Sequence, residues 1–358
     1  MTDLEGMIYT LEAISPIDGR YRQITAPLAE YFSEKALIKY RIFVEGEYLI
    51  HLSENIPDIR QFTGEEKELI RSSYPIGITD ARIVKDIETK GYKNFKRTKH
   101  DVKAVEYYLK DRLKGTSLED CLEFIHFGLT SEDINNVSYA IMISDSLGHV
   151  ILPAINSLSN KIEDMATKYK AMPMLARTHG QPASPTTVGK EFKVFSSRLA
   201  KQLYHLHQFK ISAKLNGATG NDNARHVAYP NIGWEVLSEE FIESFNKNRE
   251  IKLQPNFITT QIDPHDTYAE LFDNIKRINT ILVDFNQDMW RYISDGWFAQ
   301  KPVEGETGSS TMPQKINPID FENSEKNLKI ANMWFEFFSR ELPISRLQRD
   351  LSDSTAER

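Results

Sequence analysis

Residues 268–292, YAELFDNIKRINTILVDFNQDMWRY, carry the clearest structural pattern in the chain. Apolar residues recur along them at alternating steps of three and four and form one seam: Tyr268, Leu271, Ile275, Ile278, Leu282, Phe285, Met289 and Tyr292. This spacing is typical of a long helix packed against other helices. Further apolar residues, such as Phe272 and Ile281, lie off the seam and predict burial on more than one side. The segment is therefore expected inside a helical bundle.

Two other stretches share this helical periodicity. One covers residues 137–165, where Pro153 is expected to kink the helix, and the other covers residues 188–209. Shorter helical patterns occupy residues 35–52 and 102–109, the latter after Asp101 as a candidate cap.

Strand signals are scarce, so we predict an all-α protein. Two domains are expected: an N-terminal helical domain over residues 1–115, and a central long-helix bundle with catalytic loops over residues 116–358.

Composition narrows the function classes. The 358 residues are 40% hydrophobic and 27% charged, as is usual for a globular enzyme or binding protein. A net charge of −7 argues against binding nucleic acid. No signal peptide and no membrane span is expected, since the N-terminus lacks a basic and apolar leader and no long apolar run occurs. Cys121, the single cysteine, predicts a packed small apolar residue. A cytoplasmic protein is the expectation.

Residues 308–318, GSSTMPQKINP, form the most distinctive polar stretch. They combine hydroxyls, an amide and the cation of Lys315, which together with backbone N–H groups could hold a carboxylate. On composition alone, a polar connecting loop explains the stretch equally well.

Four shorter motifs bear polar groups: residues 19–21, 99–103, 130–136 and 178–183. Residues 130–136, TSEDINN, suit the N-terminus of a helix, which also binds anions. His179, beside Gly180, could act as an acid or base near neutral pH. Each motif alone is also explained as a cap, a turn or a solvated loop.

Other chemistries leave no signal. The chain has no glycine-rich nucleotide loop and no Gly-x-Ser-x-Gly element. His205 and His207 are two apart on a predicted helix and point in different directions, which is poor for metal binding. The inferred site therefore needs no metal and no cofactor.

Taken together, the motifs resemble the adenylosuccinate lyase branch of the fumarase/aspartase superfamily. Residues 308–318 match the superfamily's signature loop. The strings that resemble this branch are SPIDGRY (15–21), HDVKAVE (100–106), FIHF (124–127), TSED (130–133), RTHGQ (177–181) and QRDLSDS (348–354).

The resemblance implies an activity: β-elimination of fumarate from adenylosuccinate, giving AMP, and from SAICAR, giving AICAR, in purine biosynthesis. Ser309 corresponds to the general base, His179 to the general acid, and Glu322 to a carboxylate beside that histidine. The positions that match the family's substrate-binding residues are Arg20, Tyr21, Lys99, His100, Asp101, Thr130, Ser131, Gln261, Ser310, Lys315, Asn317, Asn323, Arg349, Ser354, Thr355 and Arg358. Lys99 stands where relatives carry Asn.

The resemblance also implies a homotetramer whose core is the helix bundle and whose sites each use three subunits. Helix geometry agrees: residues 137–165 would span roughly 45 Å at 1.5 Å per residue. If consecutive long helices run antiparallel, Thr130 and Ser131 lie far from His179 within one chain. Only another subunit could then bring them together.

The family continues beyond the point where this sequence stops, with a further long helix and a small helical domain. An uncovered apolar face is therefore expected at Ile330, Met333, Trp334, Phe337 and Phe338. Two alternatives to the leading hypothesis remain open: another fumarate-releasing enzyme, such as an argininosuccinate lyase, and a catalytically silent structural protein on the same fold.

Overall fold

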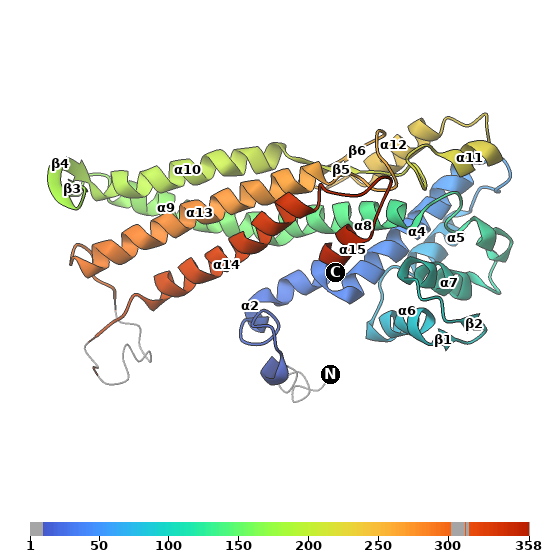
Figure 1. The fold of residues 1–358 in the computed structure, drawn as a ribbon, viewed down its shortest axis with the longest axis horizontal. Coiled ribbons are helices and arrows are strands. Elements are labelled where there is room, and N and C mark those ends of the chain that lie inside the picture. Colours follow the sequence, from blue (N-terminus) through green and yellow to red (C-terminus); the bar gives the residue numbers. More distant parts are fainter. Residues whose placement is uncertain (1–9, 302–311, 313–314, 358) are drawn as a thin grey trace. The chain divides into compact units, whose positions relative to one another are not determined.

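A computed structural model describes residues 10–301, 312 and 315–357, and helices dominate it (Figure 1). The all-α prediction is therefore confirmed. The chain forms two compact units. Unit 1 contains the chain up to Ile151, with Lys210–Pro264 and Arg346–Asp350. Unit 2 contains Leu152–Phe209, His265–Ser345 and the residues from Leu351 onward. The predicted boundary at residue 115 falls inside unit 1 and stays a prediction.

Unit 1 is built around two helices that pack against each other, α4 (Glu34–Asn55) and α8 (Ser131–Ser146). The Ser33 hydroxyl caps α4 by accepting the Ala36 N–H at 3.1 Å. Residues 132–142 of α8 are buried without exception, so this helix is surrounded on all sides. The other elements of unit 1 are α2 (Arg22–Thr25), η1 (Ala26–Leu28), α3 (Ala29–Phe32), α5 (Gly64–Arg71), α6 (Ile78–Thr89), β1 (Gly91–Tyr92), β2 (Phe95–Lys96), α7 (Asp101–Leu113), η2 (Glu119–Phe124), η3 (Leu147–Ile151), β5 (Lys210–Ala213), α11 (Asn223–Ala228), α12 (Trp234–Ser244) and β6 (Lys252–Pro255).

Unit 2 is a bundle of long helices. It contains α9 (Leu152–Lys168), β3 (Pro173–Thr178), β4 (Gln181–Thr187), α10 (Val188–Gln208), α13 (Asp266–Ser294), α14 (Ile319–Glu341) and α15 (Ser352–Glu357). Helix α10 packs between α9 and α13, and α13 packs on α14. The predicted seam is the buried face of α13: six of its eight members are buried, and Phe285 and Tyr292 are half-buried.

The predicted helix over residues 137–165 is interrupted earlier than expected. A π-helical turn, η3, separates α8 from α9 ahead of Pro153. Proline has no N–H to donate to the carbonyl four residues earlier, so the backbone hydrogen-bond pattern of the helix must change over the preceding turn. The run from Ser131 to Lys168 is long and apolar enough to cross a membrane by length and composition, and half of its most apolar window is buried inside the protein. Core helices of soluble proteins pass the same test.

The strands are the main element that the sequence did not predict. Three two-stranded pairs occur in the described residues: β1–β2 and β3–β4 are antiparallel, and β5–β6 is parallel. Such short pairs carry little periodic signal. A smaller correction concerns α7, which His100 caps by accepting the Lys103 N–H at its Nδ1 (3.3 Å), while Asp101 is the first helical residue.

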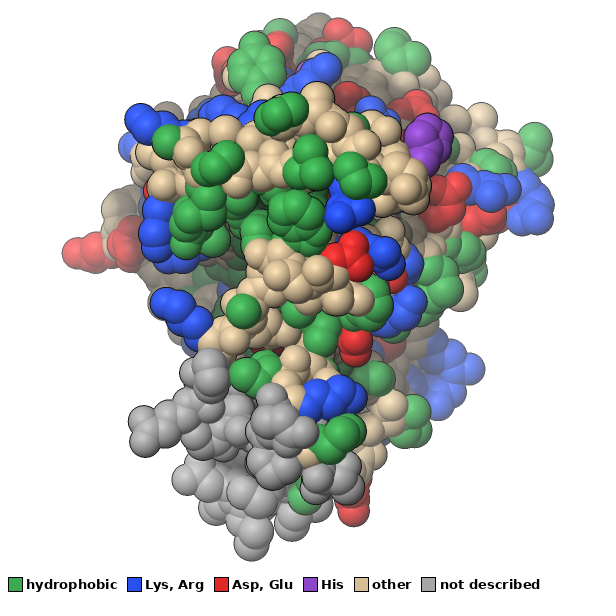
Figure 2. All heavy atoms as spheres, turned by 90° about the vertical axis from the view of Figure 1, so that its left-hand side faces the viewer, with side chains coloured by type: hydrophobic (Ala, Val, Ile, Leu, Met, Phe, Trp, Pro, Cys, Tyr) green, Lys and Arg blue, Asp and Glu red, His purple; other side chains and the backbone are tan. Residues whose placement is uncertain are grey.

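Helix α14 leaves apolar side chains uncovered, as predicted. Ile330, Met333, Trp334 and Phe337 are 56, 58, 50 and 45% exposed, and Phe338 is half-buried. Hydrophobic side chains also lie open between charged ones in the view of Figure 2. An apolar helix face that the rest of its unit leaves uncovered is typical of an interface with another molecule.

Candidate active site

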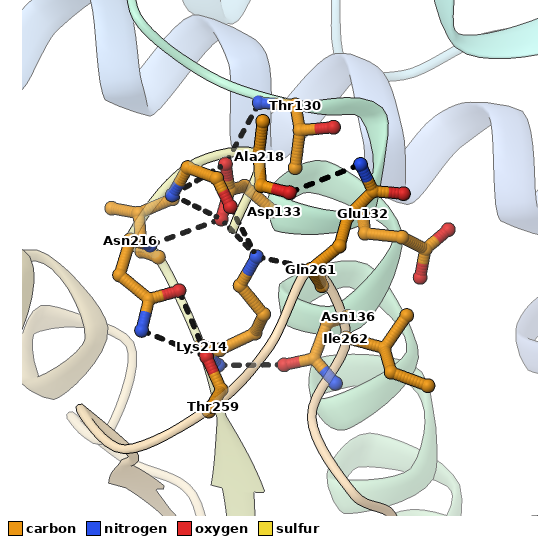
Figure 3. A network of polar contacts seen from close by, with 12 residues as sticks. Thr130, Glu132, Asp133, Asn136, Lys214, Asn216, Ala218, Thr259, Gln261 and Ile262 are labelled. Atoms are coloured by element: carbon orange, nitrogen blue, oxygen red, sulfur yellow. Dashed lines mark hydrogen bonds and ion pairs between the residues drawn. The ribbon is translucent and has the colours of Figure 1, made fainter. Parts of the chain in front are cut away.

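The first cluster of predicted site residues lies at the start of α8 in unit 1 (Figure 3). The Asp133 carboxylate accepts the Thr130 N–H at 2.8 Å and so caps the helix from inside its first turn. It also accepts the N–H groups of Asn216 (3.0 Å) and Gly217 (3.2 Å), which follow β5. The motif at residues 130–136 is therefore a helix start, as predicted, and Asp133 ties it to a distant segment.

Lys214 completes this cluster. Its ammonium lies 2.9 Å from Asp133 Oδ1 and donates to the carbonyls of Gly217 (3.0 Å) and Gln261 (2.7 Å). The Gln261 side chain in turn donates to the Ala218 carbonyl at 3.1 Å. Gln261, one of the predicted substrate-binding residues, is thus held on both its backbone and its side chain.

A second chain of contacts links Asp101 to Arg349. Arg41, only 1% exposed, places its Nη2 2.7 Å from Asp101 Oδ2 and donates from Nε to Asn135 at 2.8 Å. Asn135 donates to Glu132 at 2.6 Å, and Glu132 pairs with Arg349 at 2.8 Å. Two predicted site residues, far apart in sequence, are therefore connected through buried polar side chains.

His126 belongs to the FIHF motif and adopts a left-handed backbone with φ = 64°. Its Nδ1 lies 2.5 Å from Oε1 of Glu45, whose side chain is fully buried. Burial alone would lower the pKa of His126, but the charge and hydrogen bond of Glu45 outweigh it, and the pKa is raised. The pair adds a charged contact between α4 and the segment that leads into α8.

His179 lies in unit 2, at the turn of the β3–β4 hairpin. Thr178 pairs with Gln181, so His179 and Gly180 alone form the loop, and both have positive φ (52° and 73°). Two-residue hairpin loops of this kind match the twist of their strands. The predicted loop is thus a hairpin, and the imidazole is exposed at its end.

The start of α14 lies at the same end of unit 2 as this hairpin (Figure 1). Glu322, in the first turn of α14, accepts a hydrogen bond from the Trp290 indole N–H at 3.0 Å. Within the described part of the chain, no hydrogen bond joins Glu322 to His179. Lys315 and Asn323 are exposed near this helix start. The contact of Glu322 with a catalytic histidine stays a prediction.

Some predicted residues fall elsewhere. Arg20 is exposed and Tyr21 half-buried in a turn of unit 1. Ser354 and Thr355 lie in α15 of unit 2. Ser309, Ser310 and Arg358 lie outside the described residues.

Lys99 adopts a left-handed backbone with φ = 54°, a conformation that Asn tolerates better than Lys. Its side chain is exposed next to His100. The left-handed backbone agrees with the Asn that relatives carry at this position. The role of Lys99 in substrate binding stays a prediction.

Sequence reasoning missed several residues that connect these clusters: Lys214, Arg41, Glu45, Asn216 and Trp290. A lysine between the apolar strand ISA and the turn LNG was the available signal for Lys214, because a charge there must be buried with a partner. Arg41 and Trp290 lie within helices, and no polar motif marks either residue. Cys121 is buried, as predicted, and burial raises the pKa of its thiol to about 11.

Comparison with known proteins assigns the family. A family model described as a lyase matches residues 19–331, which places the chain in that class. The adenylosuccinate lyase of Dictyostelium discoideum is 49% identical over 97% of this chain and 74% of its own length. That of Escherichia coli K12 is 45% identical over 98% of this chain and 75% of its own length. The chain belongs to the adenylosuccinate lyase family.

Solved structures agree on the fold. A fumarate lyase from Mesorhizobium sp. BNC1 superposes with a TM-score of 0.68 over 93% of this chain and 69% of its own, at 17% identity. The 3-carboxy-cis,cis-muconate lactonizing enzyme of Pseudomonas putida gives 0.70 with the same coverage, at 18% identity.

The Glu45–His126 pair predicts a pH-dependent stability. Because the pKa of His126 is raised on folding, its stabilisation is complete below the unfolded pKa of about 6.5 and is lost as pH rises through the folded value. We expect Glu45→Gln to lower the free energy of unfolding by about 2 kcal/mol at pH 6, and by clearly less at pH 9.

Urea unfolding at the two pH values measures this difference. Glu54→Gln, which removes a surface pair with Lys67, is the control and should show no such trend. An equal loss at both pH values for Glu45→Gln would mean that His126 is not charged in the folded protein.

Proposed function

We propose that this chain removes fumarate from adenylosuccinate, giving AMP, and performs the same elimination on SAICAR, the succinyl-carboxamide ribotide, giving AICAR. The observation that carries the proposal is 45–49% identity with adenylosuccinate lyases over almost the entire chain. The signature loop and the four shorter polar motifs supply residues suited to this chemistry.

The proposed reaction needs one base and one acid. Ser309 takes a proton from the carbon beside a carboxylate of the succinyl group, and the electron pair left behind forms the double bond of fumarate. The bond between carbon and nitrogen breaks, and His179 gives its proton to the departing nitrogen. A serine hydroxyl is a weak base, so backbone N–H groups and cations must activate it. Lys315 and Asn317 would stabilise the charge that develops on the carboxylate.

The unit 1 cluster suits the binding of an anionic substrate. Thr130 and Ser131 begin a helix, whose N-terminus favours negative charge. Arg349 adds a mostly buried cation that Glu132 holds in place. The residues that we assign to substrate binding are Arg20, Tyr21, Lys99, His100, Asp101, Thr130, Ser131, Gln261, Ser310, Lys315, Asn317, Asn323, Arg349, Ser354, Thr355 and Arg358, with Glu322 beside His179.

A homotetramer is part of the proposal. The uncovered apolar side chains of α14 supply a surface for self-association. The exposure of His179 at a hairpin turn supports the proposal that it enters a site completed by another copy. We further propose a cytoplasmic enzyme that needs no cofactor or metal and binds neither nucleic acid nor membranes.

The alternative function is that of an argininosuccinate lyase. Its substrate, argininosuccinate, has no purine or ribose phosphate. The decisive assay offers the purified protein adenylosuccinate, SAICAR and argininosuccinate and follows fumarate release. Cleavage of the first two alone is expected. Release from argininosuccinate alone would overturn the substrate assignment, and no release from any substrate would favour a catalytically silent relative.

Substitution of the two proton-transfer residues tests the mechanism. We expect Ser309→Ala and His179→Ala each to lower kcat by at least about 100-fold, the usual scale for losing a general acid or base. Circular dichroism and thermal unfolding establish that each variant is folded. A folded variant that keeps more than half of the wild-type turnover would remove that residue from the mechanism.

Mixing the two inactive variants tests the shared site. Hybrid tetramers would contain some sites with both Ser309 and His179 intact, so partial activity should return after subunit exchange in mild denaturant. Exchange is followed independently with differently tagged chains. Complete exchange without recovered activity would mean that both residues come from one chain.

A further inference from the structure

We propose that the buried Asp133–Lys214 ion pair is a positioning device that fixes the proposed substrate-binding residues Thr130, Gln261 and Arg349 relative to one another. The inference rests on the proposed function and assigns roles to two residues outside its binding set. Neither one is a catalytic residue.

The pair is closed to solvent. The side chains of Asp133 and Lys214 are both 0% exposed, so neither can contact a substrate. The Lys214 ammonium has three donors and three oxygens around it, from Asp133, Gly217 and Gln261. Each oxygen of Asp133 likewise accepts from backbone N–H groups. Every polar group of the pair is therefore used within the protein.

These contacts join three segments that are distant in sequence. Asp133 belongs to the first turn of α8, Lys214 follows β5, and Gln261 precedes α13. Asn216 strengthens the same junction, because its amide and the Thr259 hydroxyl exchange hydrogen bonds of 2.8 and 3.1 Å. Figure 3 shows the Lys214 ammonium between the Asp133 carboxylate and the backbone of Gln261, whose side chain points to Ala218.

The junction extends to Arg349 by two routes. The Gln261 N–H donates to the Gln348 carbonyl at 3.2 Å, which fixes the backbone just before Arg349. Glu132, the neighbour of Asp133 in α8, holds the Arg349 guanidinium at 2.8 Å. A shift of the ion pair would therefore move both supports of Arg349, along with Gln261 and the Thr130 N–H.

The energetics favour a positional role over a purely stabilising one. A buried ion pair often adds no net stability compared with apolar residues of similar size, because two charges must be desolvated. Its directional contacts instead specify one geometry. Small misplacements of binding groups are costly in enzymes, since about 1 Å can change rates about 100-fold.

The test compares Asp133→Asn with Asp145→Asn. Asp145 is also in α8 and pairs with Arg249 (2.7 Å) and Tyr40 (2.9 Å), but it contacts no proposed site residue. With adenylosuccinate, we expect Asp133→Asn to raise KM about 10- to 100-fold and to lower kcat less, because binding groups are displaced while Ser309 and His179 remain. Asp145→Asn should lower the melting temperature without raising KM.

A second variant covers misfolding. If Asp133→Asn leaves the Lys214 charge uncompensated and yields no soluble protein, the double variant Asp133→Asn/Lys214→Gln removes both charges. It should fold and show the same rise in KM. An unchanged KM in a folded variant, or an equal rise in Asp145→Asn at a matched loss of melting temperature, would overturn the inference.

Failure of the proposed function looks different. In that case the wild-type protein releases no fumarate from either substrate. Hydrogen exchange then decides on the ion pair: Asp133→Asn should speed amide exchange in residues 214–218 and 256–264, and Asp145→Asn should not. Unchanged exchange in both segments would overturn the positioning role whatever the protein's activity.

Discussion

Two opposite charges buried without solvent at the start of α8 are the constraint on which unit 1 depends. A helix start normally leaves several N–H groups to water. Helix α8 is buried from residue 132 to residue 142, so water cannot satisfy its first turn. The Asp133 carboxylate satisfies one N–H at this helix start, that of the N-cap residue Thr130, and the buried carboxylate is in turn paired with the Lys214 ammonium. The position of one helix is thereby coupled to a turn more than 80 residues away in sequence.

The long helices were predictable because their signal is periodic and local. The seam of α13 repeats over eight positions, and α10 begins and ends within one residue of its predicted range. The short strands and the π-helical turn were not predictable, since each covers only a few residues and is decided by neighbours distant in sequence. Pro153 did predict an interruption, although the ladder changes before the proline.

The candidate site likewise has a part that the sequence predicted and a part that it did not. The motifs marked which segments carry polar groups, and the described residues Asp101, Thr130, Gln261 and Arg349 do join one network in unit 1. The residues that connect them, Arg41 and Lys214, belong to no polar motif. They act through contacts with partners that lie 60 to 94 positions away in the sequence. Sequence patterns find the groups that face a ligand more readily than the groups that support them.

The hairpin turn at His179 limits which chemistry this scaffold can adopt by mutation. Position 179 requires a left-handed backbone, which glycine, asparagine, aspartate and histidine tolerate and β-branched or bulky residues do not. Replacing the imidazole by another proton donor, such as tyrosine, would therefore strain the loop as well as change the acid. The backbone at this position therefore narrows the residues that fit without strain to glycine, asparagine, aspartate and histidine, before any selection on catalysis begins.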